Sequence, residues 1–228
     1  MSTVYKLLIK MIIMKKITTT QISLLLILIF FLPSMVMAQY PEAENELDVK
    51  VIEFLKEQSR QWRDMNVPVS DGRILYDLIL EGNYKNAVEI GTSTGHSGVW
   101  IAWALSKTGG KLTTIEIDRN RHETALSNFK EVGLDKYIDA RLGNAHQLVP
   151  ELDGKYDFVF SDADKEWYKN YFIDMEPKML QNGCFVAHNT NQRSAGIREF
   201  VEYIQNHADF TTTIHPDSRS GISISYKK

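Results

Sequence analysis

The chain has 228 residues, of which 43% are hydrophobic and 24% charged, a composition typical of an ordinary soluble globular protein. Its net charge of −3 is unevenly spread, because residues 1–38 contain four lysines and no acid. Residues 39–228 therefore hold 22 basic and 29 acidic residues, a net charge of −7. This sign argues against a nucleic-acid or anionic-lipid partner and favours a small molecule or a protein.

The first 38 residues have the pattern of a secretory signal peptide. Lysines precede an apolar block at residues 22–32, and a Val-Met-Ala triplet ending at Ala38 follows it. We expect cleavage after Ala38, which would place the mature domain in the periplasm or outside the cell. Translation from Met14 would give a signal of ordinary length. The alternative is an uncleaved anchor formed by residues 22–38, although its apolar stretch is short for a bilayer span.

The next segment is predicted to be a helical lead-in. Apolar residues recur at helical spacing over residues 47–62, and a second helix is expected over residues 71–81. Between them, Pro68 favours an extended conformation at residues 67–69. We assign residues 39–64 to the lead-in and residues 65–228 to the main domain.

Strand-like and helical patterns alternate from residue 87 onward. Strands are expected at residues 87–90, 112–117, 138–142, 158–161 and 184–188. Helices are expected at residues 96–106, 119–132, 167–180 and 194–206. This alternation predicts a doubly wound α/β fold, Rossmann-like, with a mostly parallel sheet covered on both faces. The last two strands, at 211–215 and 221–226, have no helix between them and predict an antiparallel hairpin at the sheet edge.

The single cysteine lies in one of these strands. Cys184 begins the apolar run at residues 184–188, so we expect a core residue rather than a reactive thiol.

The first strand runs into a glycine-containing turn. Residues 89–97 read Glu-Ile-Gly-Thr-Ser-Thr-Gly-His-Ser, with Gly91 and Gly95 directly before a predicted helix. Glycine lets a ligand approach the backbone, and a helix N-terminus offers free N–H groups. The Gly-x-x-x-Gly spacing differs from the Gly-x-Gly-x-x-Gly of dinucleotide binders. A plain strand-to-helix turn is the alternative.

Two further strands end in residues suited to a nucleoside. Glu116 closes the second strand, where a carboxylate can accept hydrogen bonds from both ribose hydroxyls. After the third strand, Asn144 could contact an adenine edge, and a helix cap by the same side chain is the alternative.

The fourth and fifth strands end in groups that could bind a cation. Asp162, Asp164 and Lys165 follow the fourth strand, and His188 and Asn189 end the fifth. Each group alone could be a solvated turn or a hydrogen-bonded cap. Together, Asp162, His188 and Asn189 could converge on one cation, because the carboxyl ends of parallel strands share an edge.

These motifs together resemble the cation-dependent O-methyltransferases, the family of catechol and caffeoyl-coenzyme A O-methyltransferases. The similarity runs from about Met65 to the C-terminus. Its most specific segment is Asp162-Ala163-Asp164-Lys165-x-x-Tyr168. The resemblance implies S-adenosylmethionine as cofactor, a small acceptor and, as is common among relatives, a homodimer.

The resemblance also implies roles for individual residues. The cofactor would contact Glu89, Gly91, Thr92, Gly95, Ser97, Glu116, Asn144, Ala145 and Asp162. A divalent metal, Mg²⁺ or Mn²⁺, would be held by Asp162, His188 and Asn189. Lys165 would be the general base, with Asp162 and His188 beside it in the catalytic group. Met65 and Asn66 would line the cofactor and metal side, and Trp167 and Tyr168 would wall the acceptor.

One departure from the family affects the metal. The family normally has Asp-Asn where this chain has His188-Asn189. A neutral imidazole in place of a carboxylate weakens Mg²⁺ binding and favours Mn, Fe, Co or Zn. The alternative is that the metal is lost and His188 serves as a base near neutral pH.

Three functions are compared on this basis. The leading hypothesis is an exported methyltransferase that acts on a hydroxyl of a small, phenolic acceptor. The second is a non-catalytic module of the same fold that binds a nucleoside or a protein. A nicotinamide-dependent oxidoreductase fits least, because Tyr168 follows Lys165 instead of preceding it. Residues 218–223 contain no acidic residue that could bind a catechol hydroxyl. The loop at residues 191–194 is short and offers little material to form an acyl-coenzyme A site.

Overall fold

The computed structural model describes residues 39–58 and 65–228. The predicted signal peptide and residues 59–62 of the first predicted helix lie outside this part. Residues Glu42–Lys228 form one compact unit, and of the other unit, Met1–Pro41, only residues 39–41 are described. Over these described residues, no helix is long and apolar enough to cross a membrane.

The described residues form a seven-stranded sheet with the order β3-β2-β1-β4-β5-β7-β6. Five strands are parallel, and β7 and β6 are antiparallel to their neighbours at one edge. The strands are β1 (Asn86–Ile90), β2 (Lys111–Glu116), β3 (Ile138–Leu142), β4 (Tyr156–Ser161), β5 (Met179–His188), β6 (Phe210–Ile214) and β7 (Ile222–Lys227). The predicted doubly wound α/β fold and its C-terminal hairpin are confirmed.

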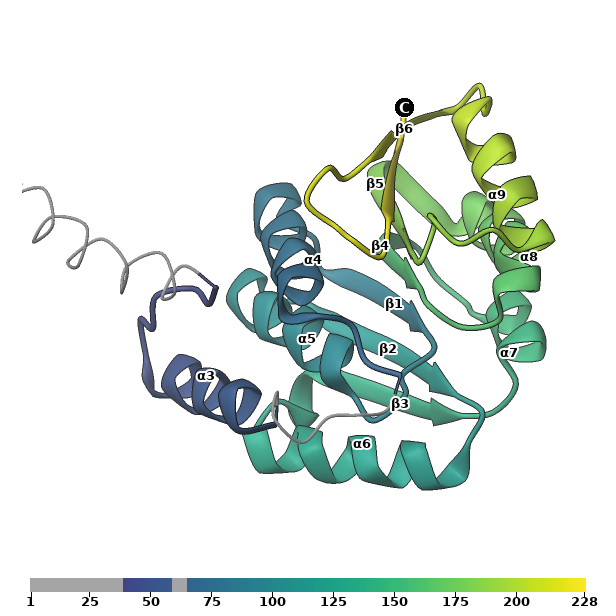
Figure 1. The fold of residues 1–228 in the computed structure, drawn as a ribbon. Helices are drawn as coiled ribbons and strands as arrows, with labels where there is room; N and C mark the ends of the chain where they lie inside the picture. Colours follow the sequence, from purple (N-terminus) through teal and green to yellow (C-terminus); the bar gives the residue numbers. More distant parts are fainter. Residues whose placement is uncertain (1–38, 59–64) are drawn as a thin grey trace, which may run out of the picture. The chain divides into compact units, whose positions relative to one another are not determined.

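Helices cover both faces of the sheet (Figure 1). One face carries α4 (Val69–Gly82), α5 (His96–Thr108) and α6 (Arg119–Val132), and the other carries α7 (Ala145–Glu151), α8 (Tyr168–Met175) and α9 (Ala195–Gln205). The lead-in helix is α3 (Glu46–Gln58), which the Trp103 indole ties to α5 by donating to Asp48 at 2.6 Å.

Both layers are packed with apolar side chains. Phe172, Phe185 and Phe200 are completely buried between the sheet and helices α8 and α9, and Trp100 and Trp103 are completely buried on α5. Burial on both faces explains why the central strands read as near-continuous apolar runs. Cys184 is buried in β5, as predicted, and burial raises the pKa of its thiol.

Several predicted boundaries were wrong. The helix predicted over residues 167–180 is α8 between two short 3-10 turns, Lys165–Trp167 and Glu176–Lys178, and β5 already begins at Met179. Pro177 explains the early end, because proline lacks an N–H and clashes with the preceding helical turn. The strand predicted to reach residue 117 ends at Glu116. Val69, the last residue of the segment predicted to be extended, is the first residue of α4. The short helix α7 was not predicted.

The register aligns the strand ends that matter for function. Ile90 pairs with Ile115 of β2 and with Ser161 of β4, and Ser161 pairs with Ala187 of β5. The strand order reverses between β1 and β4, and such a switch point opens a crevice beyond the carboxyl ends of the strands. Every predicted site segment therefore begins at this one edge.

Candidate active site

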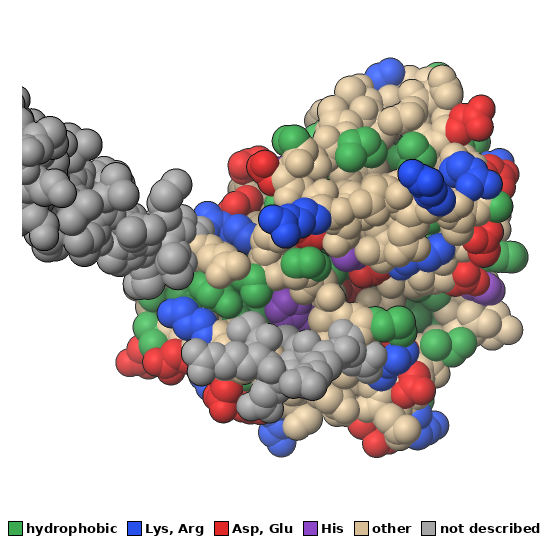
Figure 2. Space-filling model, in the orientation of Figure 1, with side chains coloured by type: hydrophobic (Ala, Val, Ile, Leu, Met, Phe, Trp, Pro, Cys, Tyr) green, Lys and Arg blue, Asp and Glu red, His purple; other side chains and the backbone are tan. Residues whose placement is uncertain are grey.

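A cavity of about 780 Å³ lies at the carboxyl ends of the parallel strands. This volume falls within the usual range for small-molecule sites. Its lining residues are Met65, Asn66, Pro68, Gly91, Ser93, Ile115, Glu116, Ile117, Arg121, Asn144, Ala145, His146, Asp162, Ala163, Asp164, Lys165, Tyr171, His188, Asn189, Gln192 and Ser220. On the face drawn in Figure 2, acidic and basic side chains are interspersed rather than gathered into one patch.

The turn after β1 forms one wall and needs glycine for steric reasons. Gly91 has φ of 99°, and a Cβ there would lie 2.6 Å from the Asp162 carbonyl oxygen. Gly95 has φ of 96°, and a Cβ there would lie 2.8 Å from the ring of Phe129. The turn can therefore lie directly on the β4 loop, and α5 begins immediately behind it at His96.

Glu116 lies at the end of β2 with its carboxylate held by backbone amides. Ser93 N donates to Oε2 at 2.7 Å and Asp118 N donates to Oε1 at 2.9 Å. Each carboxylate oxygen keeps a second lone pair, and Glu116 lines the cavity. This prepositioned carboxylate can accept hydrogen bonds from the two hydroxyls of a ribose. The site therefore fits a nucleoside cofactor.

The next part of the site combines a helix cap at the start of α7 with an aromatic stack between α7 and the 3-10 turn Lys165–Trp167. The Asn144 side chain accepts from His146 N at 3.0 Å and caps α7, which is the alternative considered from the sequence, and it also lines the cavity. The His146 ring stacks on Trp167 with ring centroids 4.2 Å apart, and its Nε2 lies 3.2 Å from Asp164. The sequence analysis did not identify His146 as a wall residue.

Some predicted cofactor residues lie beneath the cavity instead of lining it. Glu89, Thr92, Gly95 and Ser97 are buried and support the turn from below. Glu89 accepts from the Thr114 hydroxyl at 2.6 Å, and burial raises its pKa to about 8. Its role in this structure is to support the turn that carries Gly91.

Asp162 is the centre of a charged cluster at the end of β4. Its Oδ1 accepts from Lys165 Nζ at 2.6 Å, and its Oδ2 lies 3.0 Å from His188 Nδ1. The Tyr168 hydroxyl lies 3.4 Å from Asp162 Oδ1 and 3.2 Å from the His188 carbonyl oxygen. Tyr168 is completely buried and does not line the cavity, so the expectation that it walls the acceptor was wrong.

The other side of His188 is occupied by a residue that the sequence analysis missed. Asp71, in the first turn of α4, lies with Oδ2 2.9 Å from His188 Nε2. Ser218, in the loop between β6 and β7, donates to the same oxygen at 3.0 Å. Asp71 and the His188 side chain are 1% and 5% exposed, so this is a buried ion pair. From sequence, Asp71 is an ordinary acidic residue of a first helical turn.

The pKa values of the cluster follow from these contacts. Burial alone would raise the pKa of each carboxyl, but hydrogen bonds from His188 hold both Asp71 and Asp162 below their ordinary values. Burial would lower the pKa of His188, but its bonds to Asp162 and Asp71 raise it to about 9. Ionised carboxylates can only accept hydrogen bonds, so both ring nitrogens donate and His188 is an imidazolium.

This donor set does not fit the predicted metal. A metal ligand must offer a free lone pair, whereas both nitrogens of His188 carry protons directed at carboxylates. For the same reason, His188 does not fit the alternative of a base near neutral pH. Asn189 adopts the left-handed conformation, with φ of 58°, and lines the cavity without joining the cluster.

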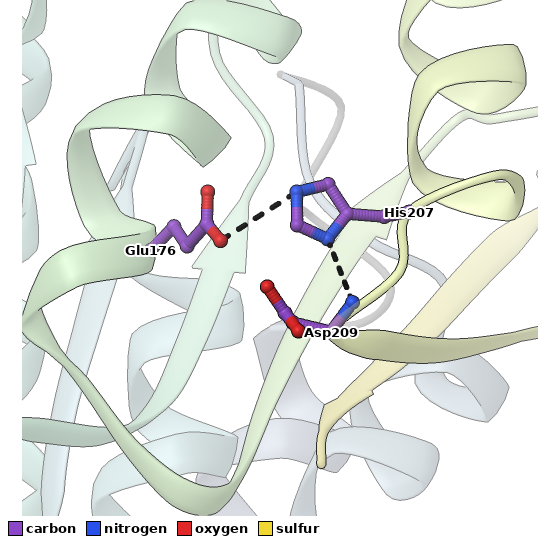
Figure 3. Close-up of side chains that lie close together, drawn as sticks. All are labelled: Glu176, His207 and Asp209. Atoms are coloured by element: carbon purple, nitrogen blue, oxygen red, sulfur yellow. Dashed lines mark hydrogen bonds and ion pairs between the residues drawn. The ribbon is translucent and has the colours of Figure 1, made fainter.

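Within residues 39–58 and 65–228, one group of His and acidic side chains has metal-like spacing, and it lies elsewhere. Glu176, His207 and Asp209 come together before the amino ends of β5 and β6, at the edge opposite the cavity (Figure 3). His207 Nε2 is 3.5 Å from Glu176, and His207 Nδ1 accepts from Asp209 N at 3.3 Å. Glu176 and His207 are partly buried and Asp209 is exposed, and because exposed acidic groups are common without a metal, we assign no function to this group.

The chain is similar in sequence to known O-methyltransferases. A family model described as O-methyltransferase matches residues 42–212. A caffeoyl-CoA O-methyltransferase of Medicago sativa is 33% identical over 64% of this chain and 64% of its own length. A catechol O-methyltransferase of Niastella koreensis is 36% identical over 47% of this chain and 50% of its own length. The chain thus spans less than two thirds of the length of these curated relatives.

The solved structures show the same fold. The O-methyltransferase TomG from Streptomyces achromogenes, in complex with SAM, aligns with a TM-score of 0.70 at 25% identity. That alignment covers 83% of this chain and 92% of TomG.

Proposed function

Because this chain belongs to the O-methyltransferase family, we propose that it transfers a methyl group from S-adenosylmethionine to a hydroxyl of a small acceptor. The observation that carries the proposal is that one cavity joins Glu116, suited to a ribose, with Lys165, suited to a reacting hydroxyl. A binding module would need only the first of these. The lysine therefore favours an enzyme over a nucleoside-binding module.

The cofactor side of the cavity is formed by the ends of β1, β2 and β3. Bound S-adenosylmethionine supplies an electrophilic sulfonium methyl group. Glu116 binds the ribose hydroxyls, and its two backbone bonds keep the carboxylate in place before the ligand arrives. Gly91 would allow the methionine part to approach the turn, and Asn144 and Ala145, which line the same cavity, would contact the adenine.

The acceptor side is formed by the ends of β4 and β5. Lys165 Nζ is held by Asp162 and by the Ala163 carbonyl oxygen at 3.2 Å, and its side chain remains 23% exposed. The hydroxyl to be methylated binds next to this nitrogen. Lys165, after losing a proton to solvent, would receive the hydroxyl proton, and the methyl group would pass from the sulfonium sulfur to the oxygen, with S-adenosylhomocysteine as the leaving group.

The acceptor proposed here is small and phenolic. Met65, Pro68 and Ile117 give the cavity apolar walls, and Tyr171 adds an aromatic one, which suits a planar ring. The names of the relatives, caffeoyl-CoA and catechol O-methyltransferases, point to phenols as well. A homodimer stays a prediction from the resemblance.

We also propose that the protein is exported. The support is the basic start, the apolar block and the triplet ending at Ala38, together with the excess of acidic residues after that point. An exported enzyme needs a supply of S-adenosylmethionine outside the cytoplasm.

The first test is calorimetric binding of S-adenosylmethionine to the purified protein and to Glu116→Gln. Wild type is expected to bind at micromolar concentration, and Glu116→Gln about ten-fold or more weakly, because hydrogen bonds to a charged group are lost. Glu123→Gln, at an exposed position of α6, is the matched control and should bind like wild type. Failure of folded wild type to bind would rule out methyl transfer and leave the binding-module hypothesis.

A further inference from the structure

Four charged side chains from separate elements form a closed set at the acceptor end of the cavity. Asp71 comes from α4, Asp162 from the end of β4, Lys165 from the following 3-10 turn and His188 from the end of β5. The contacts run from Asp71 to His188, from His188 to Asp162 and from Asp162 to Lys165, at 2.9, 3.0 and 2.6 Å. The set occupies the place where the family resemblance puts a divalent cation.

Every carboxylate oxygen of Asp162 and Asp71 already has a partner within the protein. The Asp162 oxygens accept from Lys165 and His188, and Asp71 Oδ2 accepts from His188 and the Ser218 hydroxyl. The other Asp71 oxygen lies 3.1 Å from the Ser70 hydroxyl. A metal would have to displace the imidazole and leave buried Asp71 without its charged partner, which is unfavourable.

The charge balance leads to the same conclusion. Two carboxylates face one imidazolium and one ammonium, so the cluster is neutral without any ion. A divalent cation added to this set would bring two excess positive charges into a mostly buried site, where electrostatic repulsion is strong. A carboxylate in place of His188 would reverse this, because three carboxylates against one ammonium leave the site in need of a cation.

We infer that His188, held between Asp71 and Asp162, takes the place of the divalent cation, so that methyl transfer by this protein needs no metal ion. The part of this inference that concerns catalysis, namely that methyl transfer needs no metal ion, rests on the proposed function. The absence of a metal site is a separate property and can be measured without any acceptor or cofactor.

His188 acts in this arrangement as a positioning residue. Both ring nitrogens are engaged by carboxylates, so neither remains to contact the acceptor. The ring instead fixes Asp162, which orients Lys165 through the 2.6 Å bond. The bond to Asp71 also ties the start of α4, and with it the cavity residue Pro68, to the end of β5.

The experiment is a Mn²⁺ titration by calorimetry of the purified protein and of His188→Asp. Wild type is expected to show no binding up to about 1 mM, whereas His188→Asp, with an added carboxylate ligand, is expected to bind at least about ten-fold more tightly. Asp209→Asn in both backgrounds removes the group in Figure 3, so that binding there is not mistaken for the cavity.

Two further readouts separate this role from a structural one. Nitrogen NMR of wild type at neutral pH should show both His188 ring nitrogens protonated and unchanged by Mg²⁺. Activity of wild type should be unaffected by EDTA, whereas any activity of His188→Asp should become dependent on Mn²⁺. A residue that served only for packing would not create a metal requirement when replaced.

The outcomes are distinct. Mn²⁺ binding by wild type that persists in Asp209→Asn and disappears in Asp162→Asn would overturn the inference, as would loss of activity in EDTA. If His188→Asp does not fold, the wild-type titration decides by itself. If S-adenosylmethionine does not bind, the proposed function fails, while the titration still tests the absence of a metal site.

Discussion

Asp71 and Glu89 are buried near the cavity and Asp162 is mostly buried, yet these three carboxyl groups do not share one charge state. Asp71 and Asp162 have lowered pKa values because, despite burial, each accepts a hydrogen bond from His188. Glu89 has no cation as a partner, and one of its carboxylate oxygens has no hydrogen-bond partner, so burial raises its pKa to about 8. The donors around a carboxyl therefore determine its charge more than burial does.

Because the pKa of Glu89 is raised by burial, we expect the free energy of unfolding to depend on pH. Its pKa is raised in the folded state from 4.5 to about 8, so the stability gained from its bound proton is fully present below about 4.5 and is lost as the pH rises through about 8. One proton changes the free energy of unfolding by about 1.4 kcal/mol per pH unit within this window. Glu89→Gln should flatten this part of the profile in urea unfolding. An unchanged slope in the variant would contradict the assignment.

Replacing Lys165 by arginine separates the positive charge at this position from its proposed function as a base. Lys165→Arg keeps the positive charge beside Asp162 but cannot accept a proton, so kcat should fall by about 10²–10⁴-fold with S-adenosylmethionine affinity unchanged. Steady-state kinetics with calorimetry measures both quantities. Lys169→Arg, which preserves an exposed ion pair with Glu199, is the control. Full activity of Lys165→Arg would exclude Lys165 as the base.

Two of the acidic side chains on helix α4 have different surroundings. Asp71 is buried in the first turn and bonds to His188 and Ser218 from two other parts of the chain. Asp77, two turns later, forms an i,i+4 pair with Arg73 and is 40% exposed. Asp71 therefore links α4 to the end of β5 and to the loop between β6 and β7, whereas Asp77 forms a contact within α4 alone.

This contrast predicts a difference in stability between two matched variants. Asp71→Asn leaves the His188 imidazolium with one carboxylate partner fewer in a buried site and should cost about 3–5 kcal/mol. Asp77→Asn, on the same helix, should cost at most about 1 kcal/mol, because surface pairs contribute little. Urea unfolding at neutral pH compares the two. Similar losses would show that the Asp71–His188 pair is not what anchors α4.

At the scale of the whole molecule, the described residues place the site at one edge of the sheet. The strand order reverses between β1 and β4, so that the ends of all five parallel strands contribute to one cavity. All the buried hydrophobic residues of the described chain lie between Val51 and Ile224.

Export predicts the mature N-terminus. If residues 1–38 are a cleaved signal, protein recovered from the native cell should begin at Gln39, and intact-mass measurement would show this. A soluble product that retains the N-terminal lysines would contradict export. A membrane-bound, uncleaved product would favour the anchor alternative.

The amino-acid sequence by itself determined the fold class and the location of the site. Alternating apolar runs and helical spacing specify a parallel sheet, and in such a sheet the residues after each strand meet at one edge. That is why Gly91, Glu116, Asp162 and His188 could be placed around one cavity from their positions after the strands. The same local patterns could not set the end of α8, where Pro177 acts, or reveal α7.

The chemistry of the cluster was decided only by the tertiary structure. Asp71 and His188 are 117 positions apart, and nothing local to either residue indicates the other. Their contact depends on the packing of α4 against the end of β5. Charge and metal affinity depend on distances between groups and on their burial, which only the folded chain defines. The sequence could therefore suggest a cation site, but only the three-dimensional arrangement places the His188 ring between Asp71 and Asp162 there.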